Sequence, residues 1–361
     1  MQVSTDFQDL IYTNPFYKAE KGDTFSSLKA SHAIPADAPT YNWKPRTRRE
    51  KIRDIAFNIF SLVALPCAVY NYARVAFPCA LYRYAQIFAG CLIIPSVFFS
   101  RANMLSEMVA YDEDLDVMAK FHLKRGCVKV KDRPVDVLLL VNKACPESRR
   151  WVLYSGGNGQ MMETFAGSHR HIFAELNSHI VLFNYPGTGA SCGWATRESL
   201  TETYLAMMDF VEDPISGLGA KEAIYCGFSI GGVVQGEALK QFDFQKNPDV
   251  RRLFIKDRTL TDLHTVVSKL VCRPLAYLVS LLGWNMSSKE SSEGLNGREI
   301  LIDASKDTII RKGARLGDYL DQKKAKNKIY IDWEGASHND FLDFKIGKFL
   351  IDQCENSFKT D

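Results

Sequence analysis

The sequence lacks the features that mark metal-binding, secreted or nucleic-acid-binding proteins. Its 361 residues include nine scattered cysteines, with no CxxC pair and no cysteine–histidine set spaced for zinc. This pattern indicates free thiols in a reducing compartment. The first 25 residues have no apolar core of a secretory signal, and the net charge of +3 gives no field favouring nucleic acid. We therefore expect no metal, no cofactor and no nucleic-acid partner.

Charge is almost missing from residues 55–100, where Arg74 and Arg83 are the only charged side chains. The ten residues 44–53 carry six basic side chains and one glutamate. Two uncharged runs, 55–70 and 84–100, fall slightly short of a bilayer span of about 18 to 20 residues. Prolines 66, 78 and 95 would kink helices here. We expect these residues to form either a membrane hairpin of transmembrane helices or a pair of helices lying at the membrane interface. In both cases the basic run would lie on the cytoplasmic side. An apolar layer packed on a soluble domain is the alternative.

These contrasts divide the chain into three parts. Residues 1–54 form a polar and basic tail, residues 55–105 an apolar helical extension, and residues 106–361 an α/β domain expected in the cytoplasm. In the last part, short apolar runs alternate with amphipathic stretches, which predicts a mostly parallel sheet flanked by helices. We expect strands in 117–123, 126–132, 135–142, 151–157, 179–187, 223–226, 250–257, 298–307 and 328–335, and helices in 161–176, 198–211, 233–240 and 340–352.

One serine stands among three glycines between two apolar segments. The run GFSIGG, residues 227–232, follows the strand-like AIYC and precedes the helix-like VVQGEALK. G-x-S-x-G between a buried strand and a helix is typical of a nucleophile elbow, which exposes the serine oxygen above the sheet. The strand–turn–helix frame favours this interpretation over a structural turn with an incidental serine, and Ser229 is the candidate nucleophile.

A serine hydroxyl needs a base to take its proton and an acid to hold that base. In this kind of fold the acid and then the histidine follow the serine along the chain. Asp307 follows one predicted strand and His338 follows the next. Asp303 and Asp257 are competing acids, and His264, in a stretch expected to be helical, is a competing base.

Stabilising the negative oxygen formed during acyl transfer needs two N–H donors. One is expected from the backbone of Ile230, directly after the serine, and the other from Asn158 in the loop SGGNGQ, residues 155–160. A glycine-rich loop could instead bind phosphate, but it lacks both the lysine–serine/threonine ending of a P-loop and a GxGxxG opening a helix.

Together these segments resemble the α/β-hydrolase superfamily over about residues 110–361. Six segments carry the resemblance: WVLYSGGNGQ (151–160), FNYPGTGASCG (183–193), GFSIGG (227–232), KDRTLTDL (256–263), ASKDTII (304–310) and GASHND (335–340). The chain is similar to small-lid, membrane-associated serine hydrolases and to a chlamydial hydrolase-like family with an apolar N-terminal region. The resemblance implies the α/β-hydrolase fold. It makes Ser229 the nucleophile, His338 the base, Asp307 its acid, and Asn158 and Ile230 the oxyanion donors. Gly156 replaces a histidine that commonly orders this loop in the family.

The segment 258–297 leaves room for a small lid only. It contains an apolar helical stretch, Val266–Trp284, which would either border an acyl-binding site or cover the sheet. We expect a serine esterase, lipase or thioesterase acting on a small-molecule or lipid-like acyl substrate, with membrane association through residues 55–100. The alternatives are an acyltransferase, a non-catalytic hydrolase scaffold at a membrane, and an N-terminal region that binds a partner protein.

Overall fold

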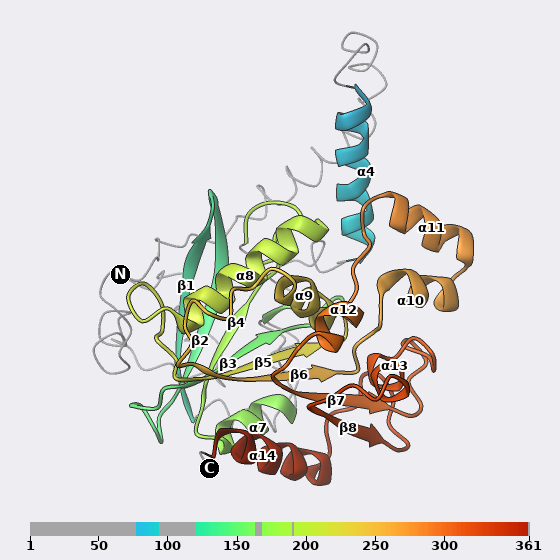
Figure 1. Cartoon of the computed structure of the whole chain (residues 1–361). Helices are drawn as coiled ribbons and strands as arrows, with labels where there is room; N and C mark the ends of the chain where they lie inside the picture. The colour runs from blue at the N-terminus through green and yellow to red at the C-terminus, as the bar shows by residue number, and fades with distance from the viewer. Residues whose placement is uncertain (1–76, 94–119, 163–167, 190, 360–361) are drawn as a thin grey trace, which may run out of the picture.

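The computed structural model describes residues 77–93, 120–162, 168–189 and 191–359. Its centre is a sheet of eight strands in the order β1-β2-β4-β3-β5-β6-β7-β8 (Figure 1). The first two pairs, β1–β2 and β2–β4, are antiparallel, and all further pairs are parallel. The strands are β1 Phe121–Val130, β2 Arg133–Asn142, β3 Arg150–Ser155, β4 His179–Phe183, β5 Glu222–Phe228, β6 Arg251–Asp257, β7 Arg298–Ala304 and β8 Lys328–Trp333.

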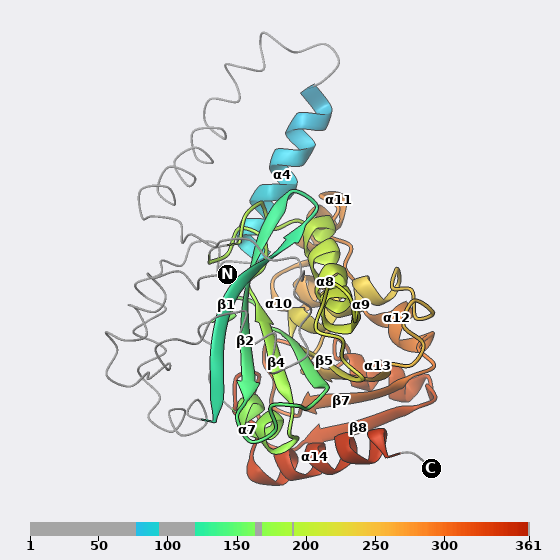
Figure 2. The same ribbon diagram turned by 90° about the vertical axis from the view of Figure 1, so that its left-hand side faces the viewer.

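Helices cover both faces of this sheet. The helices are α4 Phe77–Ile93, α7 Ser168–Glu175, α8 Arg197–Glu212, α9 Ile230–Leu239, α10 Leu263–Leu270, α11 Arg273–Leu281, α12 Lys289–Glu293, α13 Leu316–Gln322 and α14 Phe344–Phe358. Helices α8 and α9 lie on one face, and α7 and α14 lie on the other (Figures 1 and 2). The mostly parallel α/β fold predicted from the sequence is confirmed.

Side chains of β3 show how this fold follows from strand periodicity. Successive side chains of a strand point to opposite faces of its sheet. Trp151 and Leu153 belong to the core shared with α8 and α9, whereas Val152 and Tyr154 belong to the core shared with α7 and α14. A central strand buried on both faces therefore reads as the continuous apolar run that the sequence has here.

Several predicted element boundaries differ from the structure, and two of the differences have a local cause. The strands expected at 117–123 and 126–132 are one strand, β1, because Gly126 continues the pairing and lies opposite Val137 of β2. The hairpin between β1 and β2 turns at Lys131, whose φ is 53°. The closing helix begins at Phe344 rather than at residue 340, because the Asp343 carboxylate caps it by accepting from the Ile346 N–H at 2.8 Å.

Only α4 is described within the predicted apolar extension, since the tail 1–54 and the run 55–70 lie outside the described residues. Pro78 stands in the first turn of α4, where proline starts a helix rather than kinking it. Gln86, in the C-terminal half, accepts a hydrogen bond from the Trp284 indole through its backbone oxygen at 3.1 Å. No helix of the described residues is long and apolar enough to cross a membrane, so the predicted transmembrane helix has no support from them.

Candidate active site

The turn between β5 and α9 consists of Ser229 alone. Its φ of 53° and ψ of −118° place it in a backbone region that residues with a side chain rarely adopt. Two of the surrounding glycines are needed for close approach. A Cβ on Gly227 would lie 2.6 Å from the backbone of Gly232, and a Cβ on Gly231 would lie 2.2 Å from the Ser155 carbonyl oxygen. The glycines thus let strand and helix meet at an angle that leaves the serine at the edge of the sheet.

The His338 imidazole lies in direct contact with both Ser229 and Asp307. The Nε2 atom of His338 is 3.0 Å from Oγ of Ser229, and its Nδ1 atom is 2.6 Å from Oδ2 of Asp307. Each residue is 6% exposed. They follow β5, β8 and β7 respectively, and the carboxyl ends of parallel strands share one edge of a sheet. The imidazole therefore bridges the hydroxyl and the carboxylate in the arrangement that nucleophilic catalysis by serine requires.

The competing residues make other contacts. Asp303 lies within β7, where its carboxylate accepts from the Asp318 N–H at 3.2 Å. Burial, followed by the charge of Asp318, raises the pKa of Asp303 to about 7. The Asp257 carboxylate pairs with Arg258, and His264 lies on α10 with its Nδ1 atom 2.9 Å from the Ser280 hydroxyl. None of these side chains contacts Ser229 or His338 among the described residues.

The glycine loop after β3 passes close to the serine. A Cβ on Gly157 would lie 3.4 Å from the Ser229 Cβ and 2.7 Å from the Phe228 ring. Neither the Asn158 N–H nor the Ile230 N–H donates a hydrogen bond to another described residue. Their role as oxyanion donors stays a prediction.

Two residues that the sequence analysis did not assign hold this loop. The Gln160 side-chain oxygen accepts from the Gly157 N–H at 2.8 Å, and the Tyr185 hydroxyl donates to the Gly156 carbonyl at 3.0 Å. Burial raises the pKa of Tyr185, so its hydroxyl remains a donor. Gln160 also fills the space beside Gly156, since a Cβ there would lie 3.1 Å from the glutamine side chain. The only signals for these roles were their places in the SGGNGQ and FNYPG segments.

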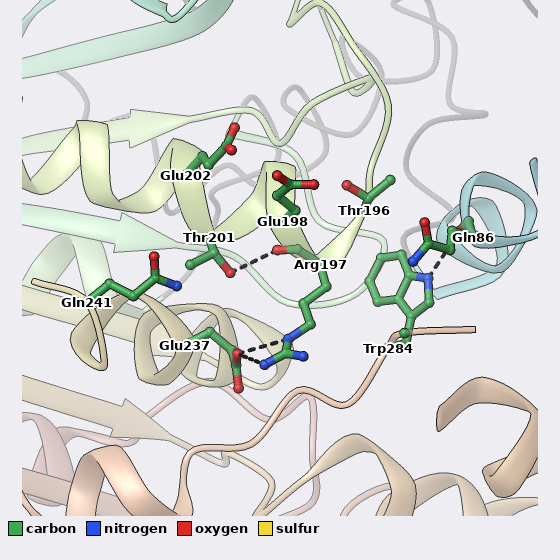
Figure 3. A pocket seen from close by; sticks show the side chains of 10 residues that line it. Gln86, Thr196, Arg197, Glu198, Thr201, Glu202, Glu237, Gln241 and Trp284 are labelled. Atoms are coloured by element: carbon green, nitrogen blue, oxygen red, sulfur yellow. Dashed lines mark hydrogen bonds and ion pairs between the residues drawn. The ribbon is translucent and has the colours of Figure 1, made fainter. Parts of the chain in front are cut away.

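A separate pocket of about 370 Å³ lies between α4, α8 and α9 (Figure 3). Its wall includes Glu198 and Glu202 of α8 and Glu237 of α9, and the guanidinium of Arg197 binds Glu237 at 2.6 and 3.0 Å. None of the Ser229, His338 and Asp307 side chains lines it, so it is not the hollow in which acyl transfer would take place.

Among the described residues, no group of three or more His, Cys, Asp or Glu side chains is placed to hold a metal ion.

The sheet order, the elbow and the bridged side chains define the α/β-hydrolase class. The chain belongs to the family described as Chlamydia CHLPS protein (DUF818), whose model matches residues 50–359, and the predicted likeness to a chlamydial family is confirmed. No curated protein matches the chain.

Solved structures support the fold. The esterase Pf2001 of Pyrococcus furiosus superposes with a TM-score of 0.53 at 14% identity, over 68% of this chain and 94% of the esterase. Acetyl xylan esterase 1 of Thermoanaerobacterium sp. JW/SL YS485 gives a TM-score of 0.51 at 10% identity, over 67% of this chain and 85% of that protein. At these identities the likeness shows the shared fold.

Proposed function

We propose that the protein is a serine hydrolase that cleaves a carboxylic ester or thioester through an acyl-enzyme. The observation that carries this proposal is the hydrogen-bonded series Ser229–His338–Asp307 at a strained elbow. That the fold is shared with two esterases supports it further. A binding scaffold with no catalytic role has no need to hold a serine in a left-handed backbone conformation against a buried imidazole.

The geometry supports a two-step reaction. His338 Nε2 takes the Ser229 proton as Oγ attacks the substrate carbonyl carbon, and the N–H groups of Asn158 and Ile230 stabilise the oxyanion. The tetrahedral intermediate collapses, the acyl–oxygen or acyl–sulfur bond breaks, and the imidazolium returns the proton to the leaving group. Water, deprotonated by the same imidazole, then releases the acid and regenerates the serine. Asp307 keeps the Nδ1 proton of His338 in place throughout.

The lid region supports a lipid-like acyl substrate. On α11 only Ala276 and Val279 are buried, whereas Tyr277 is 67% and Leu281 73% exposed. A helix that merely covered the sheet would turn its apolar side chains inward. The backbone at the end of α10 accepts a hydrogen bond from Arg311, which follows the Asp307 loop. The end of α10, the first helix of the lid region, therefore adjoins the acid loop of the proposed catalytic site.

Labelling with a fluorophosphonate probe tests the proposal. Wild-type protein should be labelled at Ser229, and the Ser229→Ala variant should not react. Ser357→Ala is the matched control, because Ser357 lies on α14, outside the loops that carry the proposed catalytic side chains, and its hydroxyl donates to the Gln353 carbonyl at 2.7 Å. It should label like wild type. Folded wild-type protein that fails to label would overturn the proposal and favour a scaffold.

Hydrolysis of ester and acyl-thioester series tests the substrate class. Activity should rise from acetyl to long-chain acyl groups, and an enzyme most active on acetyl esters would contradict a lipid-like substrate. Adding an alcohol or amine acceptor to the same assay separates hydrolysis from acyl transfer, because transfer consumes the acceptor in place of water.

A further inference from the structure

The residues directly after β6 contact each segment that carries a proposed catalytic side chain. The Asp257 carbonyl accepts from the Ser229 N–H at 2.9 Å, and the Arg258 N–H donates to Ile302 of β7 at 2.6 Å. The Arg258 guanidinium then reaches the histidine loop, where Nη1 donates to the carbonyl oxygens of His338 at 2.9 Å and Asp340 at 2.6 Å. The dipeptide Asp257–Arg258 thus makes hydrogen bonds to the segments that carry the serine, the acid and the histidine.

A buried ion pair fixes the orientation of this guanidinium. Asp257 binds it through both oxygens, at 2.8 Å to Nε and 2.7 Å to Nη2, and Oδ2 also lies 2.9 Å from His169 Nε2. Burial alone would favour the neutral carboxyl, but Arg258 and His169 more than offset it and hold the pKa of Asp257 below its usual range. The planar, two-pronged contact leaves Nη1 pointing at the two carbonyl oxygens.

Aromatic rings link the same guanidinium to the proposed base. Its central carbon lies 4.8 Å from the centre of the Phe228 ring and 5.4 Å from that of Trp333. The Phe228 ring also lies beside the His338 imidazole, at 5.2 Å between ring centres. Arg258 itself has a φ of 46°, a left-handed conformation that persists in non-glycine residues only where the surroundings hold it.

We infer that Arg258 is a positioning residue, which holds the His338 loop so that the imidazole reaches both Ser229 and Asp307. This inference rests on the proposed function. The forked shape of the guanidinium is the essential feature, because Nε and Nη2 bind the Asp257 carboxylate while Nη1 binds two backbone carbonyl oxygens. The single ammonium of lysine cannot make this set of contacts. Asp257, a competing acid in the sequence, anchors Arg258 instead.

The test compares Arg258→Gln with a matched arginine at the other end of β6. Arg252 also binds a buried carboxylate through two nitrogens, at 2.6 and 2.7 Å from Glu212, and also lies over two aromatic rings. Arg258→Gln should lower the labelling rate constant and kcat/KM by about 100-fold, with KM little changed, as expected for a displaced base. Arg252→Gln should lower thermal stability and leave the labelling rate of the folded protein unchanged.

A double-variant comparison separates positioning from a general structural role. In a His338→Ala background, Arg258→Gln should cause no further loss of activity, because Arg258 acts through the imidazole. A further loss of similar size would show a structural effect and overturn the inference. Should Arg258→Gln fail to fold, Asp257→Asn/Arg258→Gln removes both buried charges together, and the same 100-fold loss is expected of it.

A spectroscopic measurement tests Arg258 independently of activity. The short Nδ1–Oδ2 contact of His338 with Asp307 should give a far-downfield proton resonance that is present in wild type and absent in His338→Ala. Arg258→Gln should shift or abolish it, and Arg252→Gln should not. If wild type is not labelled by the probe, the proposed function fails while this measurement still decides the role of Arg258. An unchanged resonance together with a labelling rate within about threefold of wild type would overturn the inference.

Discussion

Replacing Asp307 with asparagine should trap the imidazole in the wrong tautomer. The two carboxylate oxygens have different partners. Oδ1 accepts from the N–H groups of Ile309 at 2.8 Å and Ile310 at 2.7 Å, whereas Oδ2 faces Nδ1 of His338 at 2.6 Å. In Asp307→Asn the amide oxygen must stay with the two backbone donors, because an NH₂ group cannot accept from them. The NH₂ group then faces Nδ1, which has to accept. The remaining ring proton moves to Nε2 and points at Ser229.

The expected loss is about 10⁴-fold in kcat, which corresponds to about 5.4 kcal/mol of activation free energy. Stability should change by less than about 1 kcal/mol, because both backbone donors keep their acceptor. The measurement is the rate constant of fluorophosphonate labelling together with the rate of ester hydrolysis, and unfolding by urea is followed in parallel.

Asp343 offers a matched control for this substitution. One of its oxygens accepts from the Ile346 N–H at 2.8 Å, and the other accepts from the Trp333 ring nitrogen at 3.0 Å. Asp343→Asn therefore places an NH₂ group against an indole N–H, which should cost about 1–3 kcal/mol of stability without loss of labelling. Labelling of Asp307→Asn within about tenfold of wild type would refute the tautomer argument.

Two further predictions concern packing and pH. A Cβ in Gly157→Ala would lie 2.7 Å from the Phe228 ring, so this variant should lose about 1–3 kcal/mol of stability in urea unfolding and label more slowly. In the control Gly297→Ala the new Cβ would meet nothing closer than 3.5 Å, so stability should change by less than about 1 kcal/mol. An equal change in unfolding free energy for the two variants would contradict the predicted steric overlap between residue 157 and the Phe228 ring. Because burial and Asp318 raise the pKa of Asp303 from 3.8 to about 7, the folded state binds this proton more tightly than the unfolded state. Stability should therefore fall by up to about 4 kcal/mol as pH rises from 4 to 8, and the Asp303→Asn variant should not show this loss. If the unfolding free energies of wild type and Asp303→Asn change in parallel with pH, Asp303 is not the cause.

The sheet was predictable because its strands are short apolar runs separated by helical stretches. This pattern can be recognised in the sequence without knowledge of which strands pair. The first strand was not predictable, because Lys124, Arg125 and Gly126 look like a break between two strands. Arg125 in fact stays buried in β1, where Nε lies 2.8 Å from Asp136 on the neighbouring strand. Cross-strand pairing of a buried charge overrides the local signal, and one sequence does not reveal the partner.

The lid differs from its prediction for a local reason. The stretch Val266–Trp284 was expected to be one apolar helical segment, but the structure divides it into α10 and α11. Pro274 stands in the first turn of α11. In one continuous helix it would lack the N–H that bonds to the Leu270 carbonyl, and its ring would clash with that carbonyl, whereas in a first turn neither contact is required. Cys272 is the extended N-cap residue at this break. The proline was visible in the sequence and outweighs the apolar periodicity that spans it.

The side chains proposed for catalysis were located from the sequence because the fold fixes their order and places each after a strand. The positioning residues follow a different logic. Strand β6 lies between β5 and β7, so its carboxyl end stands in the middle of the edge where the catalytic loops gather. Arg258, at that end, contacts a loop 80 residues away. A strand that contributes no catalytic side chain, but is flanked by strands that do, is therefore where the residues that align a hydrolase site should be sought.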